Sequence, residues 1–501
     1  MATNPKKKAQ TKAKSQVKKQ VRKAAKANPG IVIALVLVVV VVVVIAAVLY
    51  LKVPAVHDAV QNMFSSSTEN DAKNSGNTGN INEGKTPSGN EQENQGDNQT
   101  PSGGDNQTPS GGDNQGGGNQ GVNPSLVLGD GELKVHFMNV GQGDCIYIQF
   151  PDGKDMLIDC GNKSSGFSFK TLKATLDALN PDGEIDHLML THGDEDHVEY
   201  LDDIIYAYQI HNIYMPNILP DPLKNPDYGK SGKQSTTQNC DNLKAQIDAL
   251  NPELLALFTD SDTLYTAVYA NFFIAALSEE NCRIVLNIDK DDSTNSIVIS
   301  DETTYELRFF CMTEAGWKEN TLKDAHEKNE ISPVGILTYN GKRIVLTGDS
   351  NDGNEAEIAA RIGNIYCDVL KVAHHGSETS SLPVFLDAIT CEYAVISCNA
   401  RGNTFYHPRQ ETLDRLIERN YTIFRTDLNG TVVLTVDSEG NMLFVAEKET
   451  TLELLHNGIS SEEAKILGEY NSAKNEKGIS AEEKEARTNA YNEKLAEFLG
   501  Y

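Results

Sequence analysis

The sequence predicts an α/β protein, a four-layer αββα sandwich, between about residues 125 and 448. Short apolar runs end in Gly, Pro and Asp turns, and helical spacing follows such runs in both halves of this segment. Strands are predicted at 133–140, 145–150, 156–158, 187–190, 335–339, 343–347, 368–372 and 394–397, and helices at 169–179, 198–208, 354–362 and 409–419. Two mixed halves, each a sheet with helices beside it, favour a sandwich because each sheet must bury an apolar face.

A membrane anchor is predicted before this domain. Residues 1–30 hold ten Lys or Arg and no acidic residue, and residues 31–51 form an uncharged, apolar run of 21 residues. A helix of this length spans a hydrocarbon core about 30 Å thick. The alternative, a cleaved signal peptide with Ala46-Ala47 near its cleavage point, has a shorter apolar core. The positive-inside rule therefore predicts a cytoplasmic tail at residues 1–30 and an extracellular domain; a nucleic-acid-binding arm is the less favoured role for the tail.

Three other segments lie outside the regular pattern. Residues 52–124 predict a disordered linker, since they are rich in Gly, Asn, Gln and Ser and repeat the octapeptide 100–107 from residue 108. The sequence also predicts an insertion at about 217–282, with a helical stretch at 241–277, and a charged, solvated helical tail at 449–501. The eight cysteines form no CxxC pair, and Cys145, Cys160 and Cys367 lie in or beside apolar runs. Export permits disulfides, but buried free thiols are the favoured state for these three.

Metal-ligating side chains are concentrated after the predicted strand at 187–190. The ligand candidates are His192, Asp194, Asp196 and His197, within six residues. Imidazole nitrogens and carboxylate oxygens bind divalent metals, and an open coordination position can activate water. A solvated acidic loop is the alternative, but such a loop rarely concentrates four ligands. The pattern therefore predicts a metal site, with Asp196 also among the catalytic residues because it would hold the attacking water.

Further candidates follow other strand ends. Asp349 comes after Gly348, and His374-His375 follows the strand at 368–372. One of these two histidines is expected to face the substrate as a catalytic residue while the other turns away or binds metal; strand alternation leaves open which. His407 is the candidate last metal ligand, with a surface histidine as the alternative. Asp159 and, more weakly, Asp144 fit carboxylates that orient a ligand, or plain turn acids.

These motifs together resemble the metallo-β-lactamase superfamily. The superfamily pattern His-x-His-x-Asp-His appears here as His-x-Asp-x-Asp-His, with Asp194 in place of the second histidine, a variant that resembles the extracellular domain of the ComEC family of competence DNA-uptake proteins. The resemblance extends over residues 133 to about 447 through the segments 137–144, 157–161, 346–349, 370–377 and 407–408. It implies that His192 and Asp194 serve one metal, that Asp196 and His197 serve the other, and that Asp349 bridges both.

The departures from the family pattern bear on the metals. Dinuclear relatives have one more ligand histidine between the first motif and the bridging aspartate, whereas this interval offers His211 and His326, neither in a matching context. The resemblance therefore implies one or two divalent ions. Asp194 adds a hard oxygen ligand, which favours manganese without excluding zinc.

The expected reaction is hydrolysis of a phosphodiester by metal-activated water, and the resemblance implies nucleic acid as a possible substrate. The 34 basic and 71 acidic residues after residue 30 give a formal charge of −37, which works against non-specific capture of a polyanion. A single predicted span also argues against a DNA-uptake pore. The alternatives are a surface esterase resembling the phosphorylcholine esterases of this fold and a non-catalytic binding module. The pattern gives β-lactam hydrolysis less support than either.

Overall fold

The computed structural model describes residues 128–500, except 130, 162, 164–166, 222–235, 259–266, 303, 321, 323, 402 and 403. The predicted cytoplasmic tail, membrane span and most of the linker lie outside these residues. Within the described ranges, no helix is both long and apolar enough to cross a membrane.

The first sheet has eight strands in the order β15-β14-β1-β2-β3-β4-β5-β6. Their bounds are β1 (Leu133–Phe137), β2 (Ile146–Gln149), β3 (Asp155–Ile158), β4 (Glu184–Met189), β5 (Gln209–Met215), β6 (Arg283–Leu286), β14 (Val432–Val436) and β15 (Met442–Ala446). The strands from β15 to β3 pair antiparallel, and those from β3 to β6 pair parallel. The parallel strands end at one edge, where the loop after β4 begins.

The second sheet has seven strands in the order β13-β12-β11-β10-β9-β8-β7. Their bounds are β7 (Ile297–Ser300), β8 (Tyr305–Phe310), β9 (Val334–Tyr339), β10 (Lys342–Leu346), β11 (Val369–Lys371), β12 (Tyr393–Ile396) and β13 (Thr422–Arg425). Strands β10 to β13 are parallel to one another, and β7 to β10 pair antiparallel. The four strands predicted in this half are therefore present as β9 to β12, with the predicted end at 339 matched and the other boundaries shifted by one residue.

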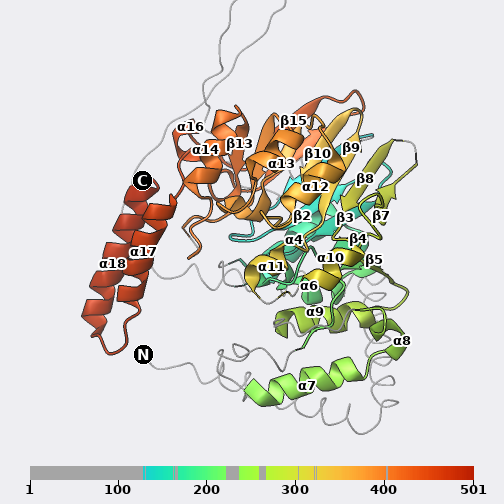
Figure 1. Cartoon of the computed structure of the whole chain (residues 1–501), viewed down its shortest axis with the longest axis horizontal. Helices are drawn as coiled ribbons and strands as arrows, with labels where there is room; N and C mark the ends of the chain where they lie inside the picture. Colours follow the sequence, from blue (N-terminus) through green and yellow to red (C-terminus); the bar gives the residue numbers. More distant parts are fainter. Residues whose placement is uncertain are drawn as a thin grey trace, which may run out of the picture. The chain divides into compact units, whose positions relative to one another are not determined.

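Helices cover both outer faces (Figure 1). Their bounds are α4 (Phe169–Leu179), α5 (Glu195–Val198), α6 (Leu201–Ile205), α7 (Thr236–Asp248), α8 (Pro252–Leu255), α9 (Ala267–Ser278), α10 (Glu314–Glu319), α11 (Ala325–Asn329), α12 (Glu355–Ile362), the 3₁₀ turn η4 (Ala373–Gly376), α13 (Pro383–Ala388), α14 (Gln410–Glu418), α15 (Thr426–Asn429), α16 (Leu452–Leu455), α17 (Ser461–Lys474) and α18 (Ala481–Phe498). The helix predicted at 169–179 is found with those bounds, and Ser168 caps it by accepting a hydrogen bond from the Thr171 amide.

Three apolar clusters separate the layers. The first packs α4, α6 and α9 on the outer face of the first sheet, the second fills the space between the sheets, and the third packs α12, α13 and α14 on the second sheet. Along β1 the odd-numbered residues Leu133, Val135 and Phe137 all enter the middle cluster, as strand alternation requires. The expectation of a mixed α/β sandwich is confirmed.

Some sequence expectations need correction. The helix predicted at 198–208 is instead two short helices, α5 and α6, because the chain turns between them at Glu199 and Tyr200. The predicted insertion includes core structure, since α9 buries Tyr269, Phe272 and Phe273. The cysteine expectation is confirmed: Cys145, Cys160 and Cys367 are buried free thiols.

The tail is more closely packed than the sequence indicates. Leu467 of α17 and Leu495 of α18 pack with Tyr406 and Ile459 in a separate apolar cluster. Ile459 also forms a β-bridge with Arg409. Residues 449–500 therefore pack against the loop that contains His407.

Candidate metal centre

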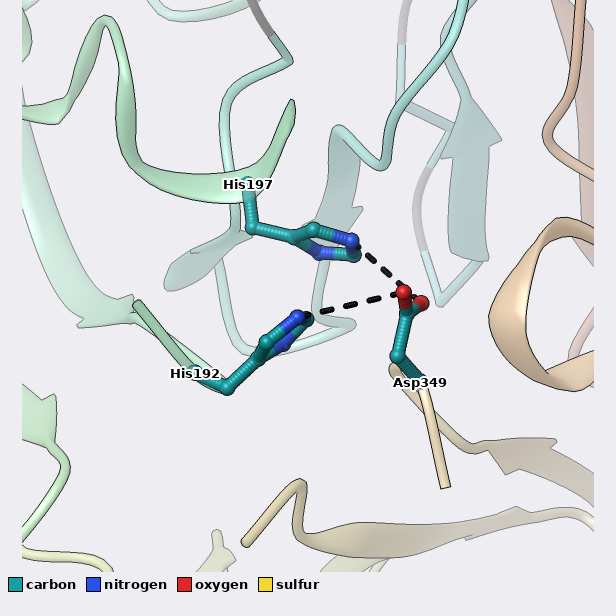
Figure 2. A group of neighbouring side chains, drawn as sticks. All are labelled: His192, His197 and Asp349. Carbon is teal, nitrogen blue, oxygen red and sulfur yellow. Dashed lines mark ion pairs between the residues drawn. The ribbon is translucent and has the colours of Figure 1, made fainter. Parts of the chain in front are cut away.

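The candidate ligands gather where strands of both sheets end. The loop after β4 carries His192, Asp194, Asp196 and His197; Asp349 follows β10, His374 and His375 lie in η4 after β11, and His407 lies between β12 and α14. Each sheet thus supplies part of the site. Figure 2 shows the rings of His192 and His197 directed at the carboxylate of Asp349, which comes from the opposite sheet.

Four of these residues form a tight group that we call the inner cluster: Asp196, His197, Asp349 and His375. The Nε2 atom of His197 lies 3.3 Å from Asp349 Oδ1 and 3.2 Å from His375 Nε2. The same His375 atom lies 3.3 Å from Asp196 Oδ2 and 3.4 Å from Asp349 Oδ2. Ligand atoms bound tetrahedrally at about 2.0–2.1 Å from one ion lie about 3.3–3.4 Å apart. These distances match the ligand spacing around one cation; Asp196, His197 and His375 form one candidate metal-binding group, and His192, His197 and Asp349 form another.

The other ring nitrogens of the two histidines are already engaged. His375 Nδ1 lies 2.8 Å from the Ser397 carbonyl, which only accepts, so this nitrogen carries a proton. His197 Nδ1 lies 2.7 Å from the Asp159 carboxylate, to which it donates when the carboxylate is ionised. In the neutral rings both Nε2 atoms then present lone pairs to each other across 3.2 Å. That arrangement needs a positive charge between or beside the rings, which either a ring proton or a bound metal ion supplies.

In the inner cluster, burial and the neighbouring charges shift the pKa values in opposite directions, and the charges together outweigh burial. Burial lowers the pKa of His375, but Asp349 and Asp196 raise it to about 10. Burial also opposes the charge on His197, yet Asp349 and Asp159 hold its pKa well above the usual value. Burial raises the pKa values of Asp349 and Asp196, but the histidines hold both below the usual range. The carboxylates draw positive charge into the cluster, where a divalent cation can replace ring protons.

Asp159 supports the loop that carries the ligands. Its side chain is fully buried and accepts hydrogen bonds from the Thr191 amide at 2.8 Å and the Thr191 hydroxyl at 2.7 Å, besides its contact with His197. Its backbone has a φ of 56°, in the left-handed region that non-glycine residues rarely adopt. Strain of this kind is held in place only where surrounding contacts fix it. Asp159 lies where a carboxylate that orients a ligand histidine is expected.

A second group, His192, Asp194 and His374, is looser; we call it the second position. His192 Nε2 lies 3.8 Å from Asp349 and 3.9 Å from Asp194, and His374 Nε2 lies 3.7 Å from Asp349. Burial, then the charge of Asp196, raises the pKa of Asp194 to about 7, so this carboxylate is poorly compensated. His192 Nε2 is buried with no hydrogen-bond partner in the described part of the chain.

No further histidine from the interval between the two motifs joins the second position. His211 pairs with Glu184 at 2.9 Å, and His326 pairs with Asp352 at 2.6 Å. Asn329 and Ser332 approach instead: the Asn329 amide lies 3.3 Å from His374 Nε2, and the Ser332 hydroxyl lies 3.3 Å from His192 Nδ1. The sequence analysis did not single out these two residues, whose types carry no metal signal.

The histidines at 374, 375 and 407 lie together. The ring centroid of His407 is 5.2 Å from that of His374 and 6.4 Å from that of His375. His374 and His375 both have positive φ angles, 49° and 54°, so the turn after β11 holds two adjacent strained residues. The side chain of His374 is 22 % exposed, whereas that of His375 is 1 % exposed. His374 therefore borders the open side of the site.

Asp144 and Lys371 lie beneath the inner cluster. The ammonium of Lys371 pairs with the Asp144 carboxylate, and both side chains are buried. Asp144 is also 3.6 Å from His375 Nδ1. Lys371 is absent from the site residues predicted above, although a lone lysine in the apolar run 369–373 is a usable signal.

Comparison with known proteins identifies a family and several relatives that this chain resembles. Residues 138–269 match the family described as the metallo-beta-lactamase superfamily, a range that includes the loop from His192 to His197. The chain is 24% identical over 315 residues to ComE operon protein 3 of Bacillus subtilis (strain 168), covering 60% of this chain and 33% of that protein. It is 39% identical over 105 residues to competence protein ComA of Neisseria gonorrhoeae, covering 21% of this chain and 15% of that protein.

A third similarity is to Recombination protein 2 of Haemophilus influenzae, at 36% identity over 98 residues, which are 19% of this chain and 12% of that protein. The chain thus spans a third or less of the length of these curated relatives. The resemblance to the superfamily and to competence proteins is confirmed.

Proposed function

The chain carries a domain of the metallo-β-lactamase superfamily, and on that premise we propose that it is a metal-dependent phosphodiesterase, with nucleic acid as a possible substrate. The inner cluster carries this proposal. Two histidine Nε2 atoms 3.2 Å apart, each ring held at its other nitrogen, with two carboxylates beside them, form a donor set suited to a divalent ion.

We assign the residues of the site different roles according to their position. Asp196, His197, Asp349 and His375 would hold the ion, zinc or manganese, while the Ser397 carbonyl and Asp159 keep the two rings oriented. When bound, such an ion lowers the pKa of water and neutralises negative charge on a phosphate. His192 and Asp194 would serve a second, weaker position.

We assign the substrate-facing role to His374. Its side chain is partly exposed, and Asn329 approaches its ring, whereas the two ring nitrogens of His375 are already occupied within the cluster. His374 would donate a hydrogen bond to a phosphate oxygen or a proton to the leaving oxygen, although burial lowers the pKa of its ring. His407, whose ring packs edge-on against that of His374, would lie beside it in the site and stays the candidate last metal ligand.

Location is part of the proposal. The apolar run at 31–51 and the basic segment before it support a single-pass membrane protein with its catalytic domain outside the cell. Protease added to intact cells should then release the domain. Protection until the cells are lysed would reverse the proposed orientation.

The function is tested with the full chain after removal of metal by a chelator. Mn²⁺ or Zn²⁺ is restored, and hydrolysis is measured on bis(p-nitrophenyl) phosphate, p-nitrophenyl phosphate and single-stranded DNA. We expect metal-dependent cleavage of the diester, with weaker action on the monoester. A chain that binds the metal but cleaves none of the three would favour the binding-module alternative.

A further inference from the structure

Lys371, the last residue of β11, is fully buried. Lysine is almost never found fully buried unless its charge is paired. Here the ammonium pairs with the carboxylate of Asp144, which is 1 % exposed, and donates a hydrogen bond to the Gly348 carbonyl at 3.2 Å. Lys371 belongs to the second sheet, and Asp144 lies in the loop between β1 and β2 of the first sheet. The pair therefore crosses between the two sheets.

Each partner of Lys371 is joined to a residue of the inner cluster. The Asp144 amide donates to the Asp196 carbonyl at 3.2 Å. At Gly143, which has a φ of +126°, an added Cβ would lie 2.2 Å from that same carbonyl, so this loop can run against Asp196 only because the residue is glycine. On the other side, Gly348 directly precedes Asp349.

The Gly348 carbonyl also connects to the histidine turn. It accepts the amide of His374 at 3.1 Å as well as the ammonium of Lys371 at 3.2 Å. One buried cation thus contacts the backbone beside Asp349 and, through Asp144, the backbone of Asp196. Asp196 and His197 come from the first sheet, and Asp349 and His375 come from the second.

We propose that Lys371 is a positioning residue: its pair with Asp144 sets the separation between the ligands of the first sheet and those of the second, and so sets the affinity of the inner cluster for metal. This inference rests on the proposed metal centre. It adds a residue that touches neither substrate nor metal.

Lys371 also protects the orientation of His375. Asp144 Oδ1 lies 3.6 Å from His375 Nδ1, which donates to the Ser397 carbonyl at 2.8 Å. An ionised carboxylate is a stronger acceptor than a carbonyl. Without Lys371, Asp144 would compete for this proton and turn the ring, which would move Nε2 away from the cluster.

The test is a Co²⁺ titration of the metal-free full chain, read by the visible absorption of the bound ion and by its dissociation constant. We expect Lys371→Met to weaken Co²⁺ binding about 10- to 100-fold and to change the absorption spectrum, which reports ligand geometry. The matched control is Lys342→Met. Lys342 pairs with Asp368 at 3.0 Å at the opposite end of β10 and β11, and its removal should leave both readouts unchanged.

Lys371→Met leaves Asp144 buried without its cation, which can prevent folding. The double variant Asp144→Asn/Lys371→Met removes both charges, and it should fold and still bind Co²⁺ at least 10-fold more weakly than wild type. Wild-type affinity within twofold and an unchanged spectrum in the folded variants would overturn this inference alone. A wild-type chain that takes up no Co²⁺ would overturn the proposed function together with it.

Discussion

The inner cluster and the second position share Asp349 but differ in how their ligands are held. In the inner cluster the neighbouring ligand atoms lie 3.2–3.4 Å apart, and the outer nitrogen of each histidine faces an acceptor. In the second position the corresponding distances are 3.7–3.9 Å. There His192 Nδ1 faces two hydroxyl groups, those of Thr191 and Ser332.

This difference shows that the loop motif alone does not arrange its candidate ligands in two equal groups. His192 and His197 come from the same loop and are both fully buried, yet only His197 meets a second ligand histidine from the other sheet. At the second position the second sheet supplies His374, whose Nε2 approaches the shared Asp349 at 3.7 Å, and Asn329 and Ser332 lie nearby. Contacts from the second sheet therefore distinguish the surroundings of His197 from those of His192.

The largest effect is expected from Asp349→Ala, because Asp349 contacts both positions. We expect kcat/KM for a phosphodiester to fall by several orders of magnitude, since activated water and charge stabilisation each contribute roughly a hundredfold or more. Asp196→Ala should behave alike, with metal content lost in both. Asp352→Ala, three residues further along and 48 % exposed, is the control. Normal turnover in a folded Asp349→Ala protein would exclude this mechanism.

A smaller effect is expected from Asp194→Ala, which touches only the second position. Activity should drop about 10- to 100-fold, the range seen when a supporting ligand contact is lost, and the size of the drop should depend on whether Mn²⁺ or Zn²⁺ is supplied. Asp194→His should shift the preference toward Zn²⁺, because imidazole suits zinc better than manganese. If Asp194→Ala were as damaging as Asp349→Ala with either metal, the two positions would be equivalent.

The sequence predicted the local parts of this comparison well. Helix α4 has an apolar repeat at Leu172, Leu176 and Leu179, and its predicted bounds match the structure. The ligand types in the loop after β4 are visible in seven consecutive residues. Such features depend on near neighbours, which a single sequence displays directly.

Features that depend on distant residues were not predictable. The loop sequence gives no sign that His197 would face His375, 178 residues away. Residues 267–278 were assigned to an insertion, because their Ala- and Phe-rich composition does not reveal that α9 completes the core over the first sheet. Likewise, the many charged residues of 449–500 mask the few buried leucines through which this segment packs against the domain.

The C-terminal helices should affect the part of the site around His407 and not the metal held by the inner cluster. Tyr406, next to His407, is 4 % exposed in the cluster that includes Leu495. Leu495→Ala should lower the free energy of unfolding by about 2–5 kcal/mol and reduce activity several-fold, with metal content unchanged. Tyr470→Ala on α17, at a side chain 36 % exposed, is the control. Loss of metal in Leu495→Ala would show that the tail also supports the inner cluster.

Part of the pH dependence of folding stability is expected to come from His136, which belongs neither to the inner cluster nor to the second position. Burial lowers its pKa to about 4, against the hydrogen bond with Gln149, which raises it. Below pH 6.5 the unfolded chain therefore binds a proton at His136 that the folded chain does not bind. The free energy of unfolding consequently decreases as pH falls from 6.5 toward 4. The loss reaches at most about 3 kcal/mol. His136→Gln should remove this pH-dependent decrease in the free energy of unfolding. If the free energies of unfolding of variant and wild type changed with pH in parallel, the assignment to His136 would be refuted.

The central claim, that the inner cluster is the principal metal site, is tested most directly by elemental analysis of the purified full chain. Wild type, His375→Ala and His192→Ala are loaded with the same metal, freed of excess, and compared for metal bound per chain. His375→Ala should lose the tightly held ion, whereas His192→Ala should keep it. Retention by His375→Ala together with loss from His192→Ala would contradict the account.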